Sequence, residues 1–125
     1  MEIVMEGPIN PQVMFDKILK SEAGSVIFHY AVVKSQAGGG TSAGIEFERA
    51  GDMEEEMSRI VADIKQQWNV EDVLLIRRIG RLQIGDTISL VAVSSPASED
   101  AFNACRYGLE RVKKMTTLKK TEKLI

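Results

Sequence analysis

Two stretches near the middle and the start of the chain carry apolar residues at the spacing of an α-helix. Residues 53–68 show the clearest pattern, with apolar positions three or four apart that share one helix face. Asp52 precedes this stretch and can cap its first turn. The pair Asn10-Pro11 is typical of a helix start, and it predicts a short helix that ends near Lys20.

A last helix is predicted over residues 99–115, with Ser98 as its N-cap. Its expected buried face consists of four residues, Phe102, Cys105, Leu109 and Val112.

Four other stretches have the alternating or continuously apolar pattern of β-strands, namely residues 25–34, 43–49, 72–79 and 87–94. Between them, residues 35–42 are expected to form a mobile loop and residues 80–86 a connection bounded by glycines. The order of the elements predicts an α+β fold with two layers, in which helices cover one face of a mainly antiparallel sheet. The β-α-β segment over residues 43–79 is expected to contribute one parallel pair.

Length and composition narrow the class of protein. The chain has 125 residues, 44% of them hydrophobic and 27% charged, so we expect one domain with a real core. No apolar run is long enough to span a membrane. Acidic residues near the start argue against a signal peptide and favour the cytoplasm. The single cysteine, Cys105, excludes an internal disulfide and a cysteine-based zinc site, and neither a metal nor a cofactor is expected.

The formal net charge of −2 hides an asymmetry along the chain. Residues 106–125 contain seven basic and two acidic side chains, whereas the rest of the chain is strongly acidic. This distribution favours an anionic ligand or partner at the C-terminal end. Residues 116–125 can also be interpreted as a flexible basic tail. Nucleic acid is disfavoured as the partner, because no aromatic residues lie between the basic residues of this tail.

Few residues offer the chemistry of a catalytic site. The only histidine, His29, lies in the middle of a predicted strand, which is more typical of a structural or surface residue than of a general base. Glu54, Glu55 and Glu56 point in different directions on a helix, so their carboxylates cannot converge on one metal ion. Their expected role is a favourable interaction with the helix dipole. The remaining candidates are cationic, and they suggest anion binding in which a lysine can act as nucleophile or proton shuttle.

Four collinear segments of the chain resemble the large, catalytic subunit of molybdopterin synthase, the MoaE family. They are EGPINP (6–11), EAGSVIF (22–28), IRRIGRLQIGD (76–86) and AFNACRY (101–107). The third segment is the most specific, because it is similar to the family's HRxGxLxxGD pattern. The resemblance covers nearly all of residues 1–125 and implies a single domain with an α/β hammerhead fold.

The resemblance also implies a reaction and partners. The family converts cyclic pyranopterin monophosphate to molybdopterin by installing two sulfurs as a dithiolene. The sulfur arrives as a thiocarboxylate on the C-terminal Gly-Gly of a small ubiquitin-like subunit, the MoaD-like carrier. Two large subunits form a homodimer within a heterotetramer.

Site residues are carried over where they match the family pattern. Lys113 and Lys120 match two lysines spaced seven apart and are expected to be catalytic. Lys34, Arg78 and Arg106 match basic positions and are expected to bind substrate.

The chain also departs from the family pattern. Lys34 stands where the family has an arginine, and Ala97-Ser98 stands where it has His-Arg. These losses are expected to concentrate where the pterin and its phosphate bind. Two hypotheses follow, a working synthase subunit or a catalytically impaired paralogue that binds a Gly-Gly carrier.

Overall fold

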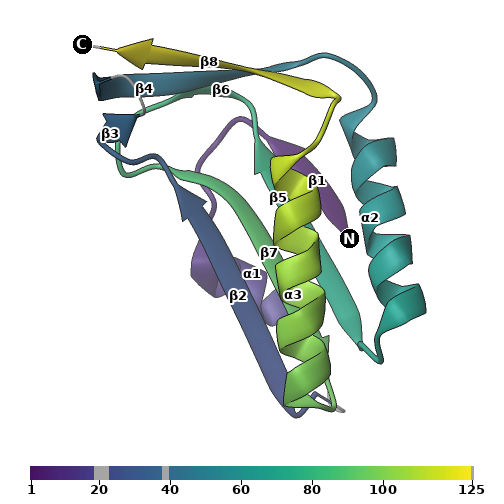
Figure 1. Ribbon diagram of the computed structural model, residues 1–125. Coiled ribbons are helices and arrows are strands. Elements are labelled where there is room, and N and C mark those ends of the chain that lie inside the picture. Colours follow the sequence, from purple (N-terminus) through teal and green to yellow (C-terminus); the bar gives the residue numbers. More distant parts are fainter. Residues whose placement is uncertain (19–22, 38–39, 125) are drawn as a thin grey trace.

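A four-stranded sheet forms the centre of the computed structural model, which describes residues 1–18, 23–37 and 40–124 (Figure 1). The strand order is β1-β5-β7-β2. The bounds of these strands are Glu2–Met5 for β1, Asp72–Arg78 for β5, Thr87–Ser95 for β7 and Ser25–Val32 for β2. Only β1 and β5 are parallel, and the other two pairs are antiparallel. The predicted α+β class with a mainly antiparallel sheet is confirmed.

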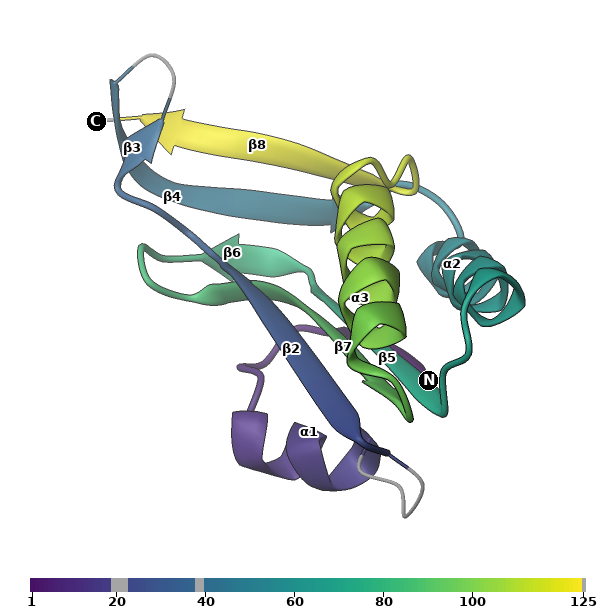
Figure 2. The ribbon, with the colours of Figure 1, turned by 60° about the horizontal axis from the view of Figure 1, so that its bottom comes forward.

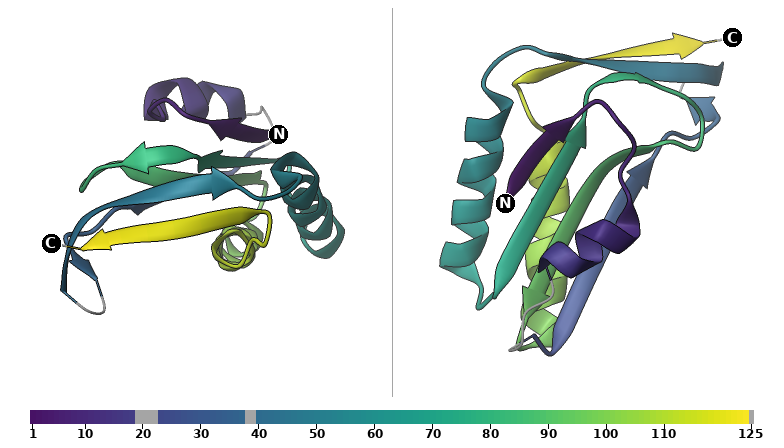
Figure 3. Two further views of the ribbon diagram at one scale, coloured as in Figure 1. Left: turned by 90° about the horizontal axis from the view of Figure 1, so that it is seen from above. Right: turned by 180° about the vertical axis from the view of Figure 1, so that it is seen from behind.

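Helices cover both faces of this sheet, not one face as predicted (Figure 2 and Figure 3). The helices are α1 (Pro11–Ile18), α2 (Met53–Gln67) and α3 (Ser98–Lys113). Successive side chains of a strand point to opposite faces. On β5, Val73 and Leu75 therefore pack under α2 and α3, whereas Leu74 and Ile76 pack against α1.

A second, smaller sheet lies across the ends of α2 and α3 (Figure 1). Its central strand is β4 (Gly40–Arg49), which pairs with β3 (Gln36–Ala37), β6 (Gly80–Leu82) and β8 (Leu118–Leu124). Gly44 in β4 has a φ of +134°, and a Cβ there would lie 2.7 Å from the carbonyl oxygen of Leu82. Only glycine therefore allows β4 and β6 to approach this closely.

Local capping signals predicted one helix start and failed at another. Asp52 caps α2 as expected, because its carboxylate accepts the backbone N–H of Glu55 at 3.0 Å. The N-cap residue of α3 is Ala97, which makes no side-chain cap. Ser98 instead shares a hydrogen bond of 2.5 Å with the hydroxyl of Ser25, so its predicted capping role is wrong.

The buried face of α3 also differs from the prediction at one end. Cys105 and Val112 are buried, but Phe102 is 59% exposed. Small residues, including Ala101 and Ala104, face the sheet instead and allow the helix to pack closely.

Several strands depend on partners far away in the sequence, and the pattern of apolar residues missed them. β1 was not predicted, and it forms the parallel pair with β5. The parallel pair expected within residues 43–79 is wrong, because β4 and β5 lie in different sheets. Within residues 35–42, the hairpin of β3 and β4 replaces much of the expected loop, and residues 38–39 lie outside the described residues. β6 lies within the expected connection at residues 80–86. The expected flexible tail is largely β8.

The described part of the chain contains no helix with both the length and the apolar character that crossing a membrane requires.

Candidate active site

A cavity of about 410 Å³ lies between the end of β2, the strands β4 and β8, and the last turn of α3. We call it the lysine cavity, because three predicted site residues line it. Lys34 follows β2, Lys113 is the last residue of α3, and Lys120 lies in β8. The other lining residues are His29, Tyr30, Ala31, Val32, Val33, Ile45, Ile88 and Glu122. The structure therefore brings together three lysines that are up to 86 positions apart in the sequence.

Pairing between β8 and β4 places two charged residues at this cavity. Lys120 lies opposite Phe47, and Glu122 lies opposite Ile45. Residues two apart in a strand share a face. Lys120 and Glu122 therefore reach the same side of the second sheet, where Ile45 forms part of the cavity wall.

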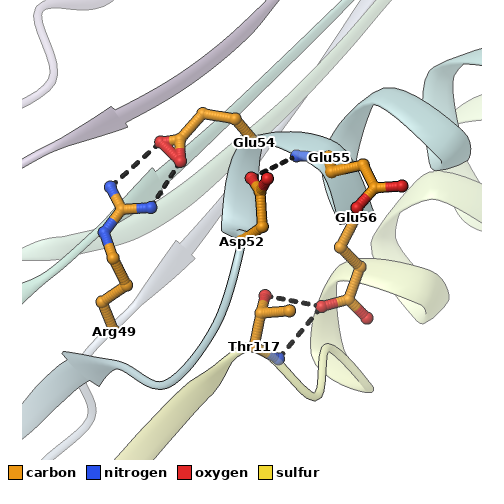
Figure 4. Close-up of polar contacts among 6 residues, drawn as sticks. All are labelled: Arg49, Asp52, Glu54, Glu55, Glu56 and Thr117. Atoms are coloured by element: carbon orange, nitrogen blue, oxygen red, sulfur yellow. Dashed lines mark hydrogen bonds and ion pairs between the residues drawn. The ribbon is translucent and has the colours of Figure 1, made fainter.

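The turn that connects α3 to β8 is held by Glu56 of α2 (Figure 4). Its carboxylate accepts the backbone N–H groups of Thr116 and Thr117 at 3.1 Å and the hydroxyl of Thr117 at 2.7 Å. Burial raises the pKa of Glu56, but these hydrogen bonds outweigh it and leave the pKa below its usual value. Lys113 and Lys120 lie on either side of this turn, so Glu56 helps to fix their relative position.

The other two acids of this helix start are engaged separately, as Figure 4 shows for Glu54. Glu54 forms an ion pair with Arg49 at the end of β4, and its Oε2 accepts from Nη2 at 3.0 Å. Glu55 forms an ion pair with Arg59 at 2.6 Å. The three carboxylates thus serve different partners, and no three potential metal ligands cluster among the described residues.

Charges in the lysine cavity, in contrast, are left without partners. None of its three lysines forms an ion pair within the described part of the chain. The Oε2 atom of Glu122 and the Nδ1 atom of His29 are buried and have no hydrogen-bond partner. A buried polar atom without a partner costs about 1–3 kcal/mol, so a ligand that pairs with such an atom would recover this cost.

The two adjacent arginines of β5 lie outside the lysine cavity and on opposite faces of the sheet. Arg78, predicted to bind substrate, is 7% exposed, and its guanidinium donates a hydrogen bond to the carbonyl oxygen of Glu6 at 2.9 Å. Arg77 stacks over the ring of Phe47 at 4.3 Å, and burial lowers the pKa of Arg77 to about 10. The predicted binding role of Arg78 stays a prediction.

Arg106 lines a neighbouring pocket of about 280 Å³ between β2 and α3. His29 borders both this pocket and the lysine cavity. Cys105 lies in the same pocket, and its thiol is directed at the carbonyl oxygen of Val91 at 3.7 Å. Burial raises the pKa of Cys105 to about 11, so the thiol stays protonated near neutral pH and is a poor nucleophile.

The departures from the family pattern do not gather at the lysine cavity of this chain. Ala97 and Ser98 lie at the start of α3, whereas Lys113 lies at its end. A helix of 16 residues is roughly 24 Å long, at about 1.5 Å per residue. Of the three departures at residues 34, 97 and 98, only Lys34 therefore lies at the cavity.

Sequence reasoning missed two residues of the cavity wall, His29 and Glu122. His29 was set aside because it lies within a strand, although alternation along β2 places it on the same face as Ile27, toward α3. Glu122 follows Lys120 by two residues, which is a signal only once this segment is known to be a strand.

Three comparisons with known proteins agree with this geometry. Residues 4–115 match the family model described as MoaE protein. The molybdopterin synthase catalytic subunit of Halalkalibacterium halodurans is 31% identical over 120 residues, which cover 95% of this chain and 77% of that protein. The corresponding subunit of Staphylococcus carnosus is 34% identical over 122 residues, covering 97% and 81%. The crystal structure of molybdopterin synthase from Staphylococcus aureus superimposes with a TM-score of 0.90 at 28% identity, covering 98% of this chain and 90% of that one.

Proposed function

The chain belongs to the MoaE family, and we propose that it acts as the catalytic subunit of a molybdopterin synthase through the lysine cavity. The reaction is a sulfur transfer that converts cyclic pyranopterin monophosphate to the dithiolene of molybdopterin. The observation that carries the proposal is the meeting of Lys34, Lys113 and Lys120 around one cavity.

The chemistry of the cavity suits the charges of these reactants. The pterin carries a phosphate and the sulfur donor carries a thiocarboxylate, so both are anionic. Lysine ammonium groups without ion-pair partners can bind such groups by charge-assisted hydrogen bonds. Positive charge fixed before the reaction also stabilises negative charge that develops on oxygen or sulfur during the transfer.

The predicted residues take different roles in this proposal. Lys113 and Lys120 are the catalytic pair, because they face one cavity from α3 and β8. Lys34 binds the phosphate as a point charge, without the bidentate geometry of an arginine. Arg106 adds positive charge from the neighbouring pocket. Arg78 has the least support, because its guanidinium donates to the backbone away from the cavity.

The proposed partners follow from the family. A small ubiquitin-like subunit would deliver the sulfur on its C-terminal Gly-Gly, and two copies of this chain would form the homodimer of a heterotetramer. We expect the protein in the cytoplasm, where a free thiol such as Cys105 stays reduced.

A reconstituted reaction tests the proposal. The protein is mixed with the thiocarboxylated small subunit and the cyclic pterin, and the dithiolene product is measured. We expect product with the unaltered protein and strong loss with Lys113→Ala, whereas Lys114→Ala serves as the matched control. Binding of the small subunit without formation of product would overturn the enzymatic function and leave a protein that only binds the carrier. Failure to bind the small subunit would overturn both.

A further inference from the structure

We propose that Arg77 strengthens anion binding in the lysine cavity through its charge, without touching the ligand itself. The proposal rests on the proposed function only in that it takes the lysine cavity as the anion site. Its basis is a buried guanidinium close to the cavity, whose charge has no counter-ion among the residues that the structure describes.

The guanidinium of Arg77 is buried without the partners that such a group normally has. The residue is 7% exposed, its Nε atom has no hydrogen-bond partner, and it forms no ion pair within residues 1–18, 23–37 and 40–124. Its Cζ atom lies over the ring of Phe47 at 4.3 Å, which offsets part of the cost of burial. Burial lowers the pKa of Arg77 only to about 10, so the charge is present at neutral pH. An unpaired buried charge of this kind contributes little to the stability of a fold.

The main sheet places Arg77 in a row with a residue of the cavity wall. Ser89 of β7 lies opposite Arg77 on one side and opposite Ala31 of β2 on the other. Residues directly opposite each other share a face of the sheet. Neighbouring strands are about 4.8 Å apart, so the backbones of Arg77 and Ala31 are roughly 10 Å apart. Ala31 lines the lysine cavity, and only the small side chain of Ser89 stands between the two in this row.

The second sheet connects Arg77 to the same cavity by another route. Phe47, which stacks on the guanidinium, lies opposite Lys120 of β8, so the two side chains share one face of this sheet. Phe47 also packs in one buried cluster with Val33 and Ile45, which line the cavity. The protein between the guanidinium and the cavity is therefore largely apolar.

Apolar surroundings allow a charge to act over this distance. Coulomb interactions are weakened less by protein than by water, and salt screens buried charges less than exposed ones. Because no carboxylate pairs with Arg77 in the described part of the chain, its field is not cancelled at the guanidinium. An anion in the cavity is therefore attracted by Arg77 in addition to the lysines.

The alternative interpretation is that Arg77 only joins the two sheets by stacking on Phe47. Removing a structural link of this kind would lower the stability of the protein and leave the affinity of the cavity for anions unchanged. A charge that serves anion binding should behave in the opposite way. Replacing a buried charge by an apolar side chain is often neutral or stabilising, whereas the anion would lose an attraction.

The affinity for inorganic sulfate tests the proposal without turnover. It is measured by titration calorimetry at pH 6.5 and constant ionic strength, and urea denaturation gives the stability of each variant. We expect Arg77→Met to weaken sulfate binding by about threefold to tenfold, with an unfolding midpoint that is equal or higher. Arg77→Gln, a second neutral variant, should weaken binding to the same extent. Arg77→Lys keeps the charge and should bind sulfate within about twofold of the unaltered protein.

Two further variants control for net charge and for the place of binding. Arg81→Met removes the same charge from an exposed ion pair with Glu46, so it should change the affinity by less than about twofold. Lys120→Gln should weaken binding most, because it removes a charge that lines the cavity itself.

Four results would overturn the proposal. The first is unchanged sulfate affinity in the folded neutral variants of Arg77. The second is equal weakening in Arg77→Met and Arg81→Met, which would reflect net charge alone. The third is a loss that Arg77→Lys does not recover, which would reflect the shape of the side chain. The fourth is no sulfate binding to the unaltered protein. The dithiolene assay tests the synthase reaction separately, so a failure of Arg77 is distinguishable from a failure of the proposed function.

Discussion

Two neighbouring polar regions, the turn from α3 into β8 and the lysine cavity beside it, differ in whether their charged groups have partners. At the turn itself, the carboxylate of Glu56 is saturated by hydrogen bonds from Thr116 and Thr117. In the lysine cavity beside it, Lys113 and Lys120 form no ion pair within the described residues. Both regions lie near the surface, so burial alone does not explain the difference.

This contrast separates residues that hold the fold from residues whose charges the fold leaves to solvent or to a ligand. A folded chain ordinarily pairs its buried polar atoms, because leaving one unpaired costs free energy. The Glu56 region follows that rule, whereas the cavity departs from it at His29 and Glu122. The predictions that follow alter one region at a time.

The largest effect is expected in the lysine cavity. Lys120→Ala should lower the rate of dithiolene formation by about 100-fold or more, because a positioned charge that stabilises a transition state is lost. Lys119→Ala is the matched control, because the neighbouring lysine of β8 points to the other face of the strand. Rates are compared with excess small subunit, and thermal unfolding is measured for each variant. Equal losses in the two variants would contradict the assignment of the cavity.

An intermediate effect is expected at the turn. Glu56→Ala removes the acceptor for two backbone N–H groups and one hydroxyl, so we expect the free energy of unfolding to fall by about 1–3 kcal/mol. Urea denaturation at pH 7 measures this change. Glu55→Ala is the control, since its exposed pair with Arg59 contributes much less. Stability unchanged by Glu56→Ala would show that the turn is held by other contacts.

The same contrast explains how far the sequence alone could lead. The helix α2 and its cap at Asp52 were predictable, because spacing and capping are local properties. The strands β1 and β8 were not, because each exists through pairing with a strand more than 60 residues away. Phe102 was misplaced for a related reason, since the face that α3 buries is decided by how closely small residues let it approach the sheet.

The residues of the candidate site also divide into those that the sequence predicted and those that it did not. Lys34, Lys113 and Lys120 were found because their sequence positions match a family pattern, and the structure gathers them at one cavity. His29 and Glu122 could not be placed, because their faces depend on the pairing of β2 and β8. Arg78 also matches the family pattern, but its side chain lies outside the cavity, and its binding role stays a prediction.

The smallest effect is expected in the stability of the protein at acidic pH, and it again involves Glu56. Its pKa is lowered in the folded protein from a reference value of 4.5, so its carboxylate stabilises the fold above that value. This contribution is lost as the pH falls through the lower pKa of the folded protein. The reason is that Glu56 binds a proton more readily in the unfolded chain than in the folded one. Glu56→Gln resembles the protonated acid. Its deficit in unfolding free energy should therefore be present at pH 7 and narrow below about pH 4.5 in urea titrations. A deficit that stays constant down to pH 3 would mean that the shape of the side chain, and not its charge, holds the turn beside the lysine cavity.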